Sequence, residues 1–466
     1  MDKTIRQTES INKVIANNWN GILDLSIRFG KTRIGLRLYK QFIEEQKGKA
    51  LILVPSSTIK AGWIKEDEYI KANPILVTTS QLLALNDRKI VVDLLIVDEC
   101  HKYIGETVYN LVNGNTVEYK HIVMLTGSLP SKPTLNKLTS ISPIIDTITE
   151  KEALDNGWVS NYVEYNIPLE LPDNLIVSYV DKSKVISNIL QKYRNIHRYI
   201  TVDGNSIFKD ELDLIYSCAS GKNTKRYGLI RPLGIMEAII NKMTGSPTEV
   251  WNTNQISAEA KALKSAIYSR NAIISTNEVK LKSVLYIYDT LKLPTICFSE
   301  SIDFADRIAK DINKNFGDIA FAYHSKVESK ELIDPHMRDY YRYKSGKKEG
   351  EPVIFSRKKQ LEYHIECMKY NMTKFISTVK SLDEGITIPE IECIITTAGS
   401  TNPIQYKQRT GRAKTFTNPD KIARIYNLYF KDFAFNENTY VSRDRIKLEL
   451  RQQNSQFVKE ISLSDL

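Results

Sequence analysis

Short apolar runs that each end at a polar motif constrain the fold of this chain more than any other feature. In the first 150 residues these runs alternate with amphipathic stretches, and the stretch at 34–45 has helical spacing. The runs lie at 22–25, 50–54, 76–79, 94–97 and 121–125. Alternating strands and helices are typical of a parallel sheet covered by helices, and such sheets bind ligands at the strand ends.

A similar pattern returns late in the chain. The later apolar runs lie at 295–298, 374–378 and 392–397, whereas 175–285 is polar and helical in character. Pro168 and Pro172 interrupt the pattern between the two halves. We therefore predict an α/β protein with parallel-sheet domains at 1–168 and 286–466, separated by a linker and mainly helical segment at 169–285.

The composition indicates which kinds of binding partner the chain has. A formal charge of +10 favours a polyanion, and nucleic acid is the first candidate. No apolar run reaches the roughly 18–20 residues that a membrane span needs, and the N-terminus lacks a signal-peptide pattern. None of the five cysteines forms a C-x-x-C pair, which argues against zinc. We expect a cytoplasmic protein that uses neither membrane nor zinc.

The string Gly30-Lys31-Thr32 follows one apolar run and begins the predicted helix. Backbone N–H groups at a helix N-terminus attract phosphate. Lys31 is placed to reach the β- and γ-phosphates of a nucleotide, and the Thr32 hydroxyl is placed to bind magnesium. Leu25 stands where the pattern G-x-x-x-x-G-K-[ST] has its first glycine. We predict phosphate binding here, and the alternative is an ordinary helix start.

Two adjacent carboxylates follow the run at 94–97, and they lie 67 residues after Lys31. Asp98 would hold magnesium, and Glu99 would orient or deprotonate an attacking water molecule. An acidic strand end without catalytic function is the alternative. Together with the lysine motif and His101, the pair predicts a nucleoside triphosphatase site.

Six motifs in order resemble those of superfamily 2 helicases and translocases, which have two RecA-like domains. The D-E-x-H box corresponds to 98–101 and the coupling motif to 125–128. Two motifs that contact DNA correspond to 54–63 and 78–81, and the fifth and sixth motifs correspond to 377–386 and 405–412. The resemblance covers nearly the whole chain except the middle helical segment. It implies two tandem RecA-like domains, with the helical segment inserted in or before the second.

The resemblance also implies roles for individual residues. ATP and Mg²⁺ are the expected ligands, with nucleotide contacts from Phe29, Gly30, Lys31, Thr32, Arg33, Asp98 and Gly385. Arg412 is the first choice and Arg409 the second for a catalytic arginine, because charge developing on the γ-phosphate needs cations from the second domain. The usual third arginine of this motif is Thr415 here, beside Lys414. The expected coupling residues are His101, Thr126 and Ser128, and the expected DNA contacts are Pro55, Ser56, Trp63, Thr79, Ser80, Ser377 and Thr378.

Near the N-terminus, Arg6-Gln7 resembles a motif that reads adenine. A glutamine amide can pair with both N6 and N7 of adenine. The alignment could instead place Glu9 at this position, or the residue could be an ordinary helix surface residue. We predict nucleotide contacts from Arg6 and Gln7.

The segment 338–359 is unusually basic, with eight positive and three negative residues, and Tyr340, Tyr341 and Tyr343 lie among them. Cations can bind phosphates while tyrosines stack on bases. We predict an insertion at 333–360 that contacts DNA where strands separate, notably through Lys347 and Lys348; a solvated basic loop is the alternative. His324 is either a further DNA contact or a loop histidine satisfied within the protein.

The function that fits these features is an ATP-dependent DNA helicase, monomeric or weakly oligomeric. Among its relatives the chain most resembles phage recombination helicases, which remodel forks and Holliday junctions by branch migration. The alternatives are a double-stranded DNA translocase, an RNA helicase and a nucleic-acid-binding module without hydrolysis. If the chain is encoded by a phage, it acts in the host cytoplasm.

Overall fold

The computed structural model describes residues 2–85, 89–130, 132–194, 201–202, 205–206, 212–214, 253–334, 339–379, 382, 388, 390–399, 401–452 and 458–466. The chain forms two compact units. The first contains 1–168, 282–429 and 446–466, and the second contains 169–281 and 430–445. Both large sheets have strands in the first unit, so the predicted α/β class with two parallel sheets is confirmed.

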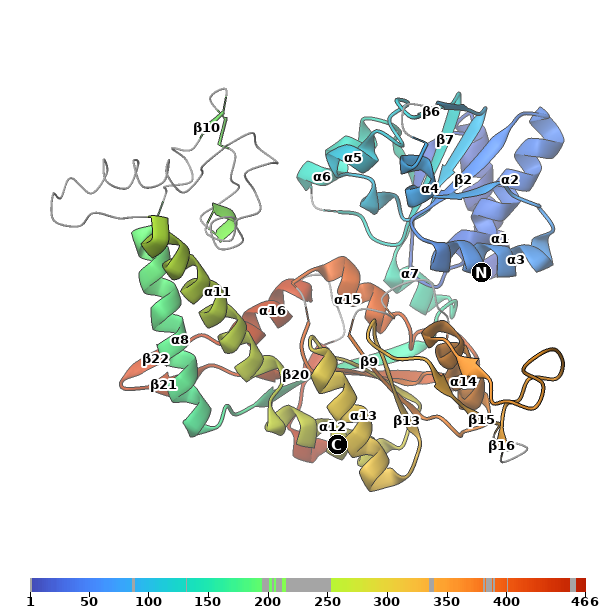
Figure 1. The fold of residues 1–466 in the computed structure, drawn as a ribbon. Helices are drawn as coiled ribbons and strands as arrows, with labels where there is room; N and C mark the ends of the chain where they lie inside the picture. Colours follow the sequence, from blue (N-terminus) through green and yellow to red (C-terminus); the bar gives the residue numbers. More distant parts are fainter. Residues whose placement is uncertain are drawn as a thin grey trace. The chain divides into compact units, whose positions relative to one another are not determined.

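The first sheet has the strand order β3-β2-β5-β7-β1-β8, and all its pairs are parallel. Its strands are β1 (Gly21–Leu25), β2 (Ala50–Val54), β3 (Leu76–Thr78), β5 (Leu94–Val97), β7 (His121–Thr126) and β8 (Ile144–Ile148). Five of the six coincide with the apolar runs that predicted strands. The longer helices around it are α1 (Lys3–Ala16), α2 (Lys31–Gln46), α3 (Ser57–Ile70) and α6 (Lys132–Thr139) (Figure 1).

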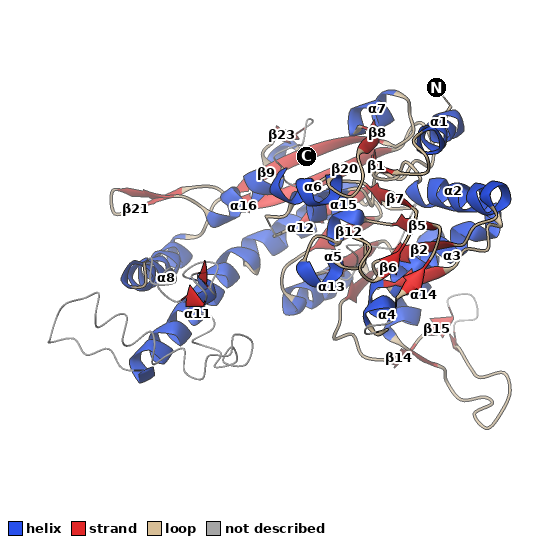
Figure 2. Ribbon diagram, turned by 90° about the horizontal axis from the view of Figure 1, so that it is seen from above, coloured by secondary structure: helices blue, strands red, loops and turns tan. Residues whose placement is uncertain are grey.

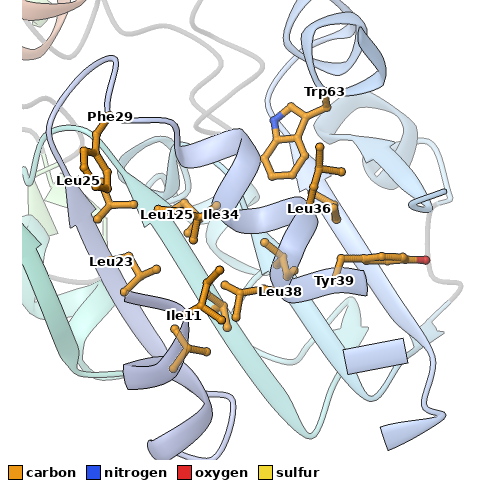
Figure 3. Close-up of a cluster of buried hydrophobic side chains, with 14 of the residues drawn as sticks. Ile11, Leu23, Leu25, Phe29, Ile34, Leu36, Leu38, Tyr39, Trp63 and Leu125 are labelled. Carbon is orange, nitrogen blue, oxygen red and sulfur yellow. The ribbon is translucent and has the colours of Figure 1, made fainter. Parts of the chain in front are cut away.

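Alternate side chains of these strands belong to two separate hydrophobic clusters. Leu23 and Leu25 of β1 pack with α1, α2 and α3 in one cluster, whereas Ile22 belongs to the other. Figure 3 shows the first cluster, with Phe29, Trp63 and Leu125 around the start of α2. Because both faces of the sheet are buried, its central strands β2 and β5 consist entirely of apolar residues, as parallel strands often do.

Shorter elements complete this half of the first unit: α4 (Thr79–Leu83), a 3₁₀ turn η1 (Cys100–Lys102), α5 (Glu106–Tyr109) and α7 (Glu150–Asp155). β4 (Ile90–Val91) and β6 (Val117–Glu118) pair with each other.

The second sheet has the strand order β13-β18-β12-β19-β20-β9-β23. Its strands are β9 (Asn161–Leu169), β12 (Thr295–Phe298), β13 (Ala320–Tyr323), β18 (Phe375–Thr378), β19 (Cys393–Thr396), β20 (Ile422–Phe430) and β23 (Val458–Glu460). The associated helices are α12 (Glu278–Leu291), α13 (Ile302–Phe316), α14 (Arg357–Lys369), α15 (Pro403–Thr410) and α16 (Arg443–Arg451). β9 ends at residue 169 and therefore lies almost wholly in the range 1–168 that was predicted for the first domain. It nevertheless joins the second sheet. A short η3 turn (Leu463–Asp465) lies near the end of the chain.

The second unit is mainly helical where it is described. α8 (Asp173–Lys192) and α11 (Thr253–Ser275) pack against each other and lie side by side in both views (Figures 1 and 2). A hairpin of β21 (Phe433–Phe435) and β22 (Asn438–Tyr440) belongs to the same unit. β10 (Thr201–Val202) pairs with β11 (Asn205–Ser206). In the described part of the chain, no helix is long and apolar enough to cross a membrane.

An irregular hairpin connects β13 to α14 within the first unit. β14 (Lys330–Glu331) pairs with β17 (Ile354–Phe355), and β15 (Ile333–Asp334) pairs with β16 (Asp339–Tyr340). Single bridges join Arg342 to Pro352 and Tyr343 to Glu349 farther out. This hairpin contains the basic segment that was identified from the sequence.

Candidate nucleotide site

The polar motifs at the strand ends meet around one pocket of about 570 Å³ in the first unit. Residues from both sheet-forming halves of this unit line it. Seven of the residues that the motifs singled out are among them: Gln7, Gly30, Lys31, Thr32, Asp98, Glu99 and Arg412. Phe29, Arg33 and Trp63 also line the pocket, and Trp63 was predicted for a different site.

The loop between β1 and α2 shapes one wall of the pocket. Gly30 has φ +109°, and a Cβ at this position would meet Nε2 of Gln7. α2 then begins at Lys31 without a side-chain cap, so its first N–H groups are not bound by a capping side chain. The N–H groups at such a helix start suit a phosphate. Leu25 simply continues β1 and buries its side chain in the core, which accounts for the missing first glycine.

Asp98 is held by two hydrogen bonds at the end of β5. Nε1 of Trp63 donates to Oδ2 at 2.8 Å, and the backbone N–H of Glu99 donates to Oδ1 at 2.9 Å. Burial, and then the neighbouring Glu99 carboxylate, raise the pKa of Asp98 to about 6. Trp63 is 1% exposed, so its predicted contact with DNA is wrong. Its indole is buried because α3 packs it against α2 and Asp98.

Glu99 connects the loop lysine to the coupling residues. Its Oε1 lies 3.2 Å from Nζ of Lys31, and its Oε2 lies 3.4 Å from Nδ1 of His101. Burial is the largest effect and opposes ionisation of Glu99, but electrostatic interactions with Lys31, His101 and Lys102 and the hydrogen bond from Lys31 together outweigh it, so the pKa of this carboxyl is lowered. Burial lowers the pKa of His101 to about 4, so its ring is neutral at pH 7. Glu99 is therefore ionised beside a neutral imidazole.

The chain of contacts continues from His101 to the end of β7. Nδ1 of His101 lies 3.1 Å from Oγ1 of Thr126, and this hydroxyl donates to the carbonyl oxygen of Ser128 at 2.9 Å. Gly127 lies between them, and a Cβ there would overlap Nζ of Lys31. The three predicted coupling residues and the loop lysine thus form one connected group.

The two residues of the N-terminal motif have different positions. Nε2 of Gln7 donates to the carbonyl oxygen of Phe29 at 2.8 Å, which fixes the glutamine beside the pocket. Arg6 instead makes a bidentate pair with Asp146 of β8, at 2.8 and 3.0 Å, and also bonds to Glu152. Arg6 does not line the pocket, and its contact with the nucleotide stays a prediction. Its guanidinium is held by the two carboxylates.

The two candidate catalytic arginines also differ. Arg412 follows α15 and lines the pocket together with Gln408 and Thr415. Arg409 is buried, donates to the carbonyl oxygen of Val379 at 3.0 Å and lies over the ring of Phe298. It is absent from the pocket lining, because these contacts hold its guanidinium against the second sheet. Arg412 is thus the better placed of the two.

The motifs did not indicate two further cationic side chains that line the pocket, Arg28 and Lys3. Arg28 has φ +70° and donates from Nε to the carbonyl oxygen of Gly411 at 3.1 Å. Burial, and then the Arg412 charge, lower the pKa of Arg28 to about 9. Lys3 donates to the carbonyl oxygen of Arg28, and burial followed by the charges of Arg33 and Arg28 lowers its pKa to about 8. Like charges held together in this way fit a polyanionic ligand. The only sequence signal for Arg28 was a charge inside a phosphate loop.

The remaining predicted DNA contacts of the first half lie at the ends of β2 and β3. Ser56 caps α3 through its hydroxyl, and Pro55 beside it is partly exposed. Thr79 is partly exposed and bonds to Tyr103, and Ser80 is exposed. These four residues are accessible, so their role in binding DNA stays a prediction.

The predicted contacts of the second half are less accessible. Ser377 and Thr378 have no exposed surface, because β18 lies between β13 and β12. His324 is 4% exposed, and its Nε2 lies 2.8 Å from Oδ1 of Asp306. These positions contradict the predicted DNA contacts and favour the alternative of a satisfied histidine. Gly385 lies outside the described residues.

The tyrosines of the basic hairpin have different environments. Tyr340 is 40% exposed, and Lys347 and Lys348 are exposed near the end of the hairpin. Tyr341 is packed near Phe355, with ring centroids 5.3 Å apart, and Tyr343 is half-buried.

The acidic pair fits magnesium. Mg²⁺ prefers oxygen ligands and is usually held by one or two carboxylates together with substrate phosphates. Asp98 offers carboxylate oxygens inside the pocket, and Thr32 offers a hydroxyl there. Among the described residues, no group of three or more His, Cys, Asp or Glu could hold a metal without such a substrate.

Comparisons with known proteins find similarity to helicases. Residues 280–415 match the model of the helicase conserved C-terminal domain. The ATP-dependent DNA helicase uvsW of Enterobacteria phage T4 is 22% identical over 267 residues, which are 46% of this chain and 53% of that protein. The chain thus spans about half the length of this curated relative.

Two solved structures are similar over nearly the whole chain. The structure of S. cerevisiae Dbp5 bound to RNA and ADP BeF3 is 10% identical, with a TM-score of 0.52. The match covers 98% of this chain and 90% of the Dbp5 chain. The Hef helicase domain of Pyrococcus furiosus is 15% identical, with a TM-score of 0.46, and covers 96% and 98%. At these identities the likeness to Dbp5 concerns the fold, which has two RecA-like domains.

Proposed function

We propose that this chain, a helicase of superfamily 2, hydrolyses ATP to unwind or remodel branched DNA such as forks and four-way junctions. One observation carries the proposal: Lys31, Glu99 and Arg412 line the same pocket although they come from distant parts of the chain. A motor needs such a site because hydrolysis must be linked to the relative positions of two domains.

The geometry supports a division of roles among these residues. Lys31 and the start of α2 would bind the β- and γ-phosphates, and Gln7 would read the adenine edge. Asp98 and Thr32 would hold Mg²⁺, which neutralises phosphate charge when it is bound. Glu99 is ionised at neutral pH and would orient or deprotonate the attacking water, while Arg412 would stabilise charge that develops on the γ-phosphate.

The contacts of Glu99 also suggest how hydrolysis is sensed elsewhere. Its carboxylate touches Lys31 on one side and His101 on the other, and His101 reaches Thr126 at the end of β7. A change at the γ-phosphate would move Lys31 and thereby alter the balance of these contacts. We propose that this group transmits the nucleotide state to the segment after β7.

DNA is the proposed substrate for two reasons. The chain is basic overall, and exposed cations gather on the hairpin that contains Lys347 and Lys348. The curated relative is named a DNA helicase. RNA unwinding and movement along duplex DNA without strand separation are the alternatives that an experiment must distinguish.

The first test measures ATP turnover with and without DNA or RNA for the wild type, Glu99→Gln and a control, Glu118→Gln. Glu118 is an exposed residue of β6 that pairs with Lys89. We expect DNA-stimulated turnover that Glu99→Gln lowers by about 100-fold or more and the control retains. Absence of turnover in the wild type would contradict the motor, and stimulation by RNA alone would favour an RNA helicase.

A second test compares unwinding of forks, four-way junctions and tailed duplexes at one salt concentration, since phosphate contacts make affinity steeply salt-dependent. Preference for forks and junctions supports remodelling of branched DNA. If ATP turnover is stimulated by DNA but none of these substrates is separated, the chain is a translocase.

A further inference from the structure

A second pocket, of about 410 Å³, lies where the basic hairpin joins α14. Its aromatic lining consists of Tyr341 and Phe355 from the hairpin and Tyr363 and Tyr370 from α14 and its end. This pocket shares no lining residue with the nucleotide site. It needs a separate explanation.

Three of these aromatic side chains pack against one another in a cluster. The centroids of Tyr341 and Phe355 are 5.3 Å apart with an interplanar angle of 58°, and those of Tyr341 and Tyr363 are 6.1 Å apart at 90°. Phe355 and Tyr363 are 6.4 Å apart at 58°. All three pairs have the tilted or edge-to-face geometry of packed aromatic rings, and the pocket lies beside this cluster, which forms its wall. A planar ring system is the ligand shape that such aromatic walls suit.

The surface beside the pocket is strongly positive. The hairpin contributes Arg342, Lys344, Lys347 and Lys348, which are exposed, and α14 begins with the exposed cations Arg357, Lys358 and Lys359. Cations at a helix N-terminus oppose the helix dipole, and phosphates bound there would relieve this repulsion. A planar ring attached to a phosphate chain is a nucleotide unit of a nucleic-acid strand.

We propose that this pocket binds one unpaired nucleobase of a DNA strand whose phosphates lie on the neighbouring cations. The inference rests on the proposed function and specifies how that function recognises single-stranded DNA. Glu362 and Glu366 also line the pocket and pair with lysines of the same helix at 3.8 and 2.7 Å. A carboxylate has acceptor sites beyond one such pair. The pocket therefore favours bases with an exocyclic amino group over thymine.

The test measures binding of three fluorescently labelled 12-nucleotide strands by anisotropy at one salt concentration. One strand carries adenine, one carries thymine, and one has the same phosphates but no bases. The wild type is compared with Tyr363→Leu and with Tyr370→Leu, in which a residue 55% exposed is changed. Tyr286→Leu, at a 45% exposed tyrosine of α12, is the matched control.

We expect the wild type to bind the adenine strand more tightly than the abasic strand, and both pocket variants to lose about fivefold to about 150-fold of that preference. Their affinity for the abasic strand and their melting temperatures should match the control. The thymine strand should bind more weakly than adenine in the wild type only.

Two results would overturn the inference. One is a preference for bases that is unchanged in both variants, and the other is an equal loss of affinity for the abasic strand, which would indicate damage to the phosphate surface. Failure of the proposed function looks different, because ATP turnover in the wild type would then not respond to DNA at all.

Discussion

Replacing Trp63 with phenylalanine tests how the structure tunes the magnesium carboxylate. The indole Nε1 donates to Oδ2 of Asp98 at 2.8 Å, and the side chain is 1% exposed. Phenylalanine keeps most of the buried ring and removes this donor. The variant should therefore act mainly through Asp98 and only slightly through packing.

The size of the effect follows from the hydrogen bond. A bond to a charged group contributes about 1.5–3 kcal/mol, and about 1.36 kcal/mol corresponds to one pKa unit, so the pKa of Asp98 should rise by about one to two units. It begins at about 6, because burial and then Glu99 raise it from the ordinary 3.8. The ionised form that binds magnesium therefore predominates only above about pH 6 in the wild type and only above about pH 7–8 in the variant.

Proton competition then predicts a specific pH profile. The magnesium concentration for half-maximal ATP turnover should increase about 2- to 10-fold at pH 7 and about 5- to 50-fold at pH 6, with almost no increase at pH 9. Trp19→Phe is the control, because this buried indole packs on Phe42 and is not bonded to Asp98. The prediction is wrong if Trp63→Phe changes the magnesium concentration for half-maximal turnover by the same factor at every pH, or does not change it.

Three other substitutions test separate contacts. Gly127→Ala should lower ATP turnover, and by less than Lys31→Ala, because its Cβ would clash with Nζ of Lys31 and the ammonium must shift. Arg28→Gln should weaken ATP binding about tenfold in competition with a fluorescent analogue, since one phosphate-facing cation is lost. Arg6→Met should lower the free energy of unfolding by about 1.5–3 kcal/mol in urea at pH 7, because Lys13 and Ser10 still bond to Asp146 after the arginine is removed. The difference should shrink as the pH falls from about 4 towards 2, because the pKa of Asp146, which burial would raise, is lowered to about 2 by Arg6 and other donors, and protonation removes this stabilisation.

The fold could be predicted from the sequence because strand runs in a parallel sheet are apolar on both faces. The runs at 50–54 and 94–97 became β2 and β5 within the stated bounds. β9 was not predicted because only three of its residues, Glu164, Ile167 and Leu169, are buried, and because its partners, β20 and β23, lie far along the chain. The local sequence pattern predicts whether a strand forms. Pairing with strands that are distant in the sequence determines which sheet it joins.

The candidate site was predictable where backbone position alone sets the geometry. Lys31 follows β1 after the loop between β1 and α2, and Glu99 follows β5 after Asp98, so both side chains lie at the same edge of the sheet. Trp63 and Ser377 depend on packing of a helix and on the order of strands, neither of which their local sequence specifies. For this reason one became a partner of Asp98 and the other became fully buried.

Of the two departures from the family pattern, Thr415 lines the nucleotide pocket, whereas Leu25 is buried in the core at the end of β1. Thr415 stands where the pattern has an arginine, and the loop that follows Leu25 brings Arg28 to the pocket from the other half of the unit. Arg28 also bonds to Gly411, the residue before Arg412. The second half lacks the arginine at position 415, and the first half supplies Arg28 to the same pocket. Because the charge of Arg412 contributes to lowering the pKa of Arg28, the two arginines interact electrostatically, and both gain from an anion bound between the loop and α15.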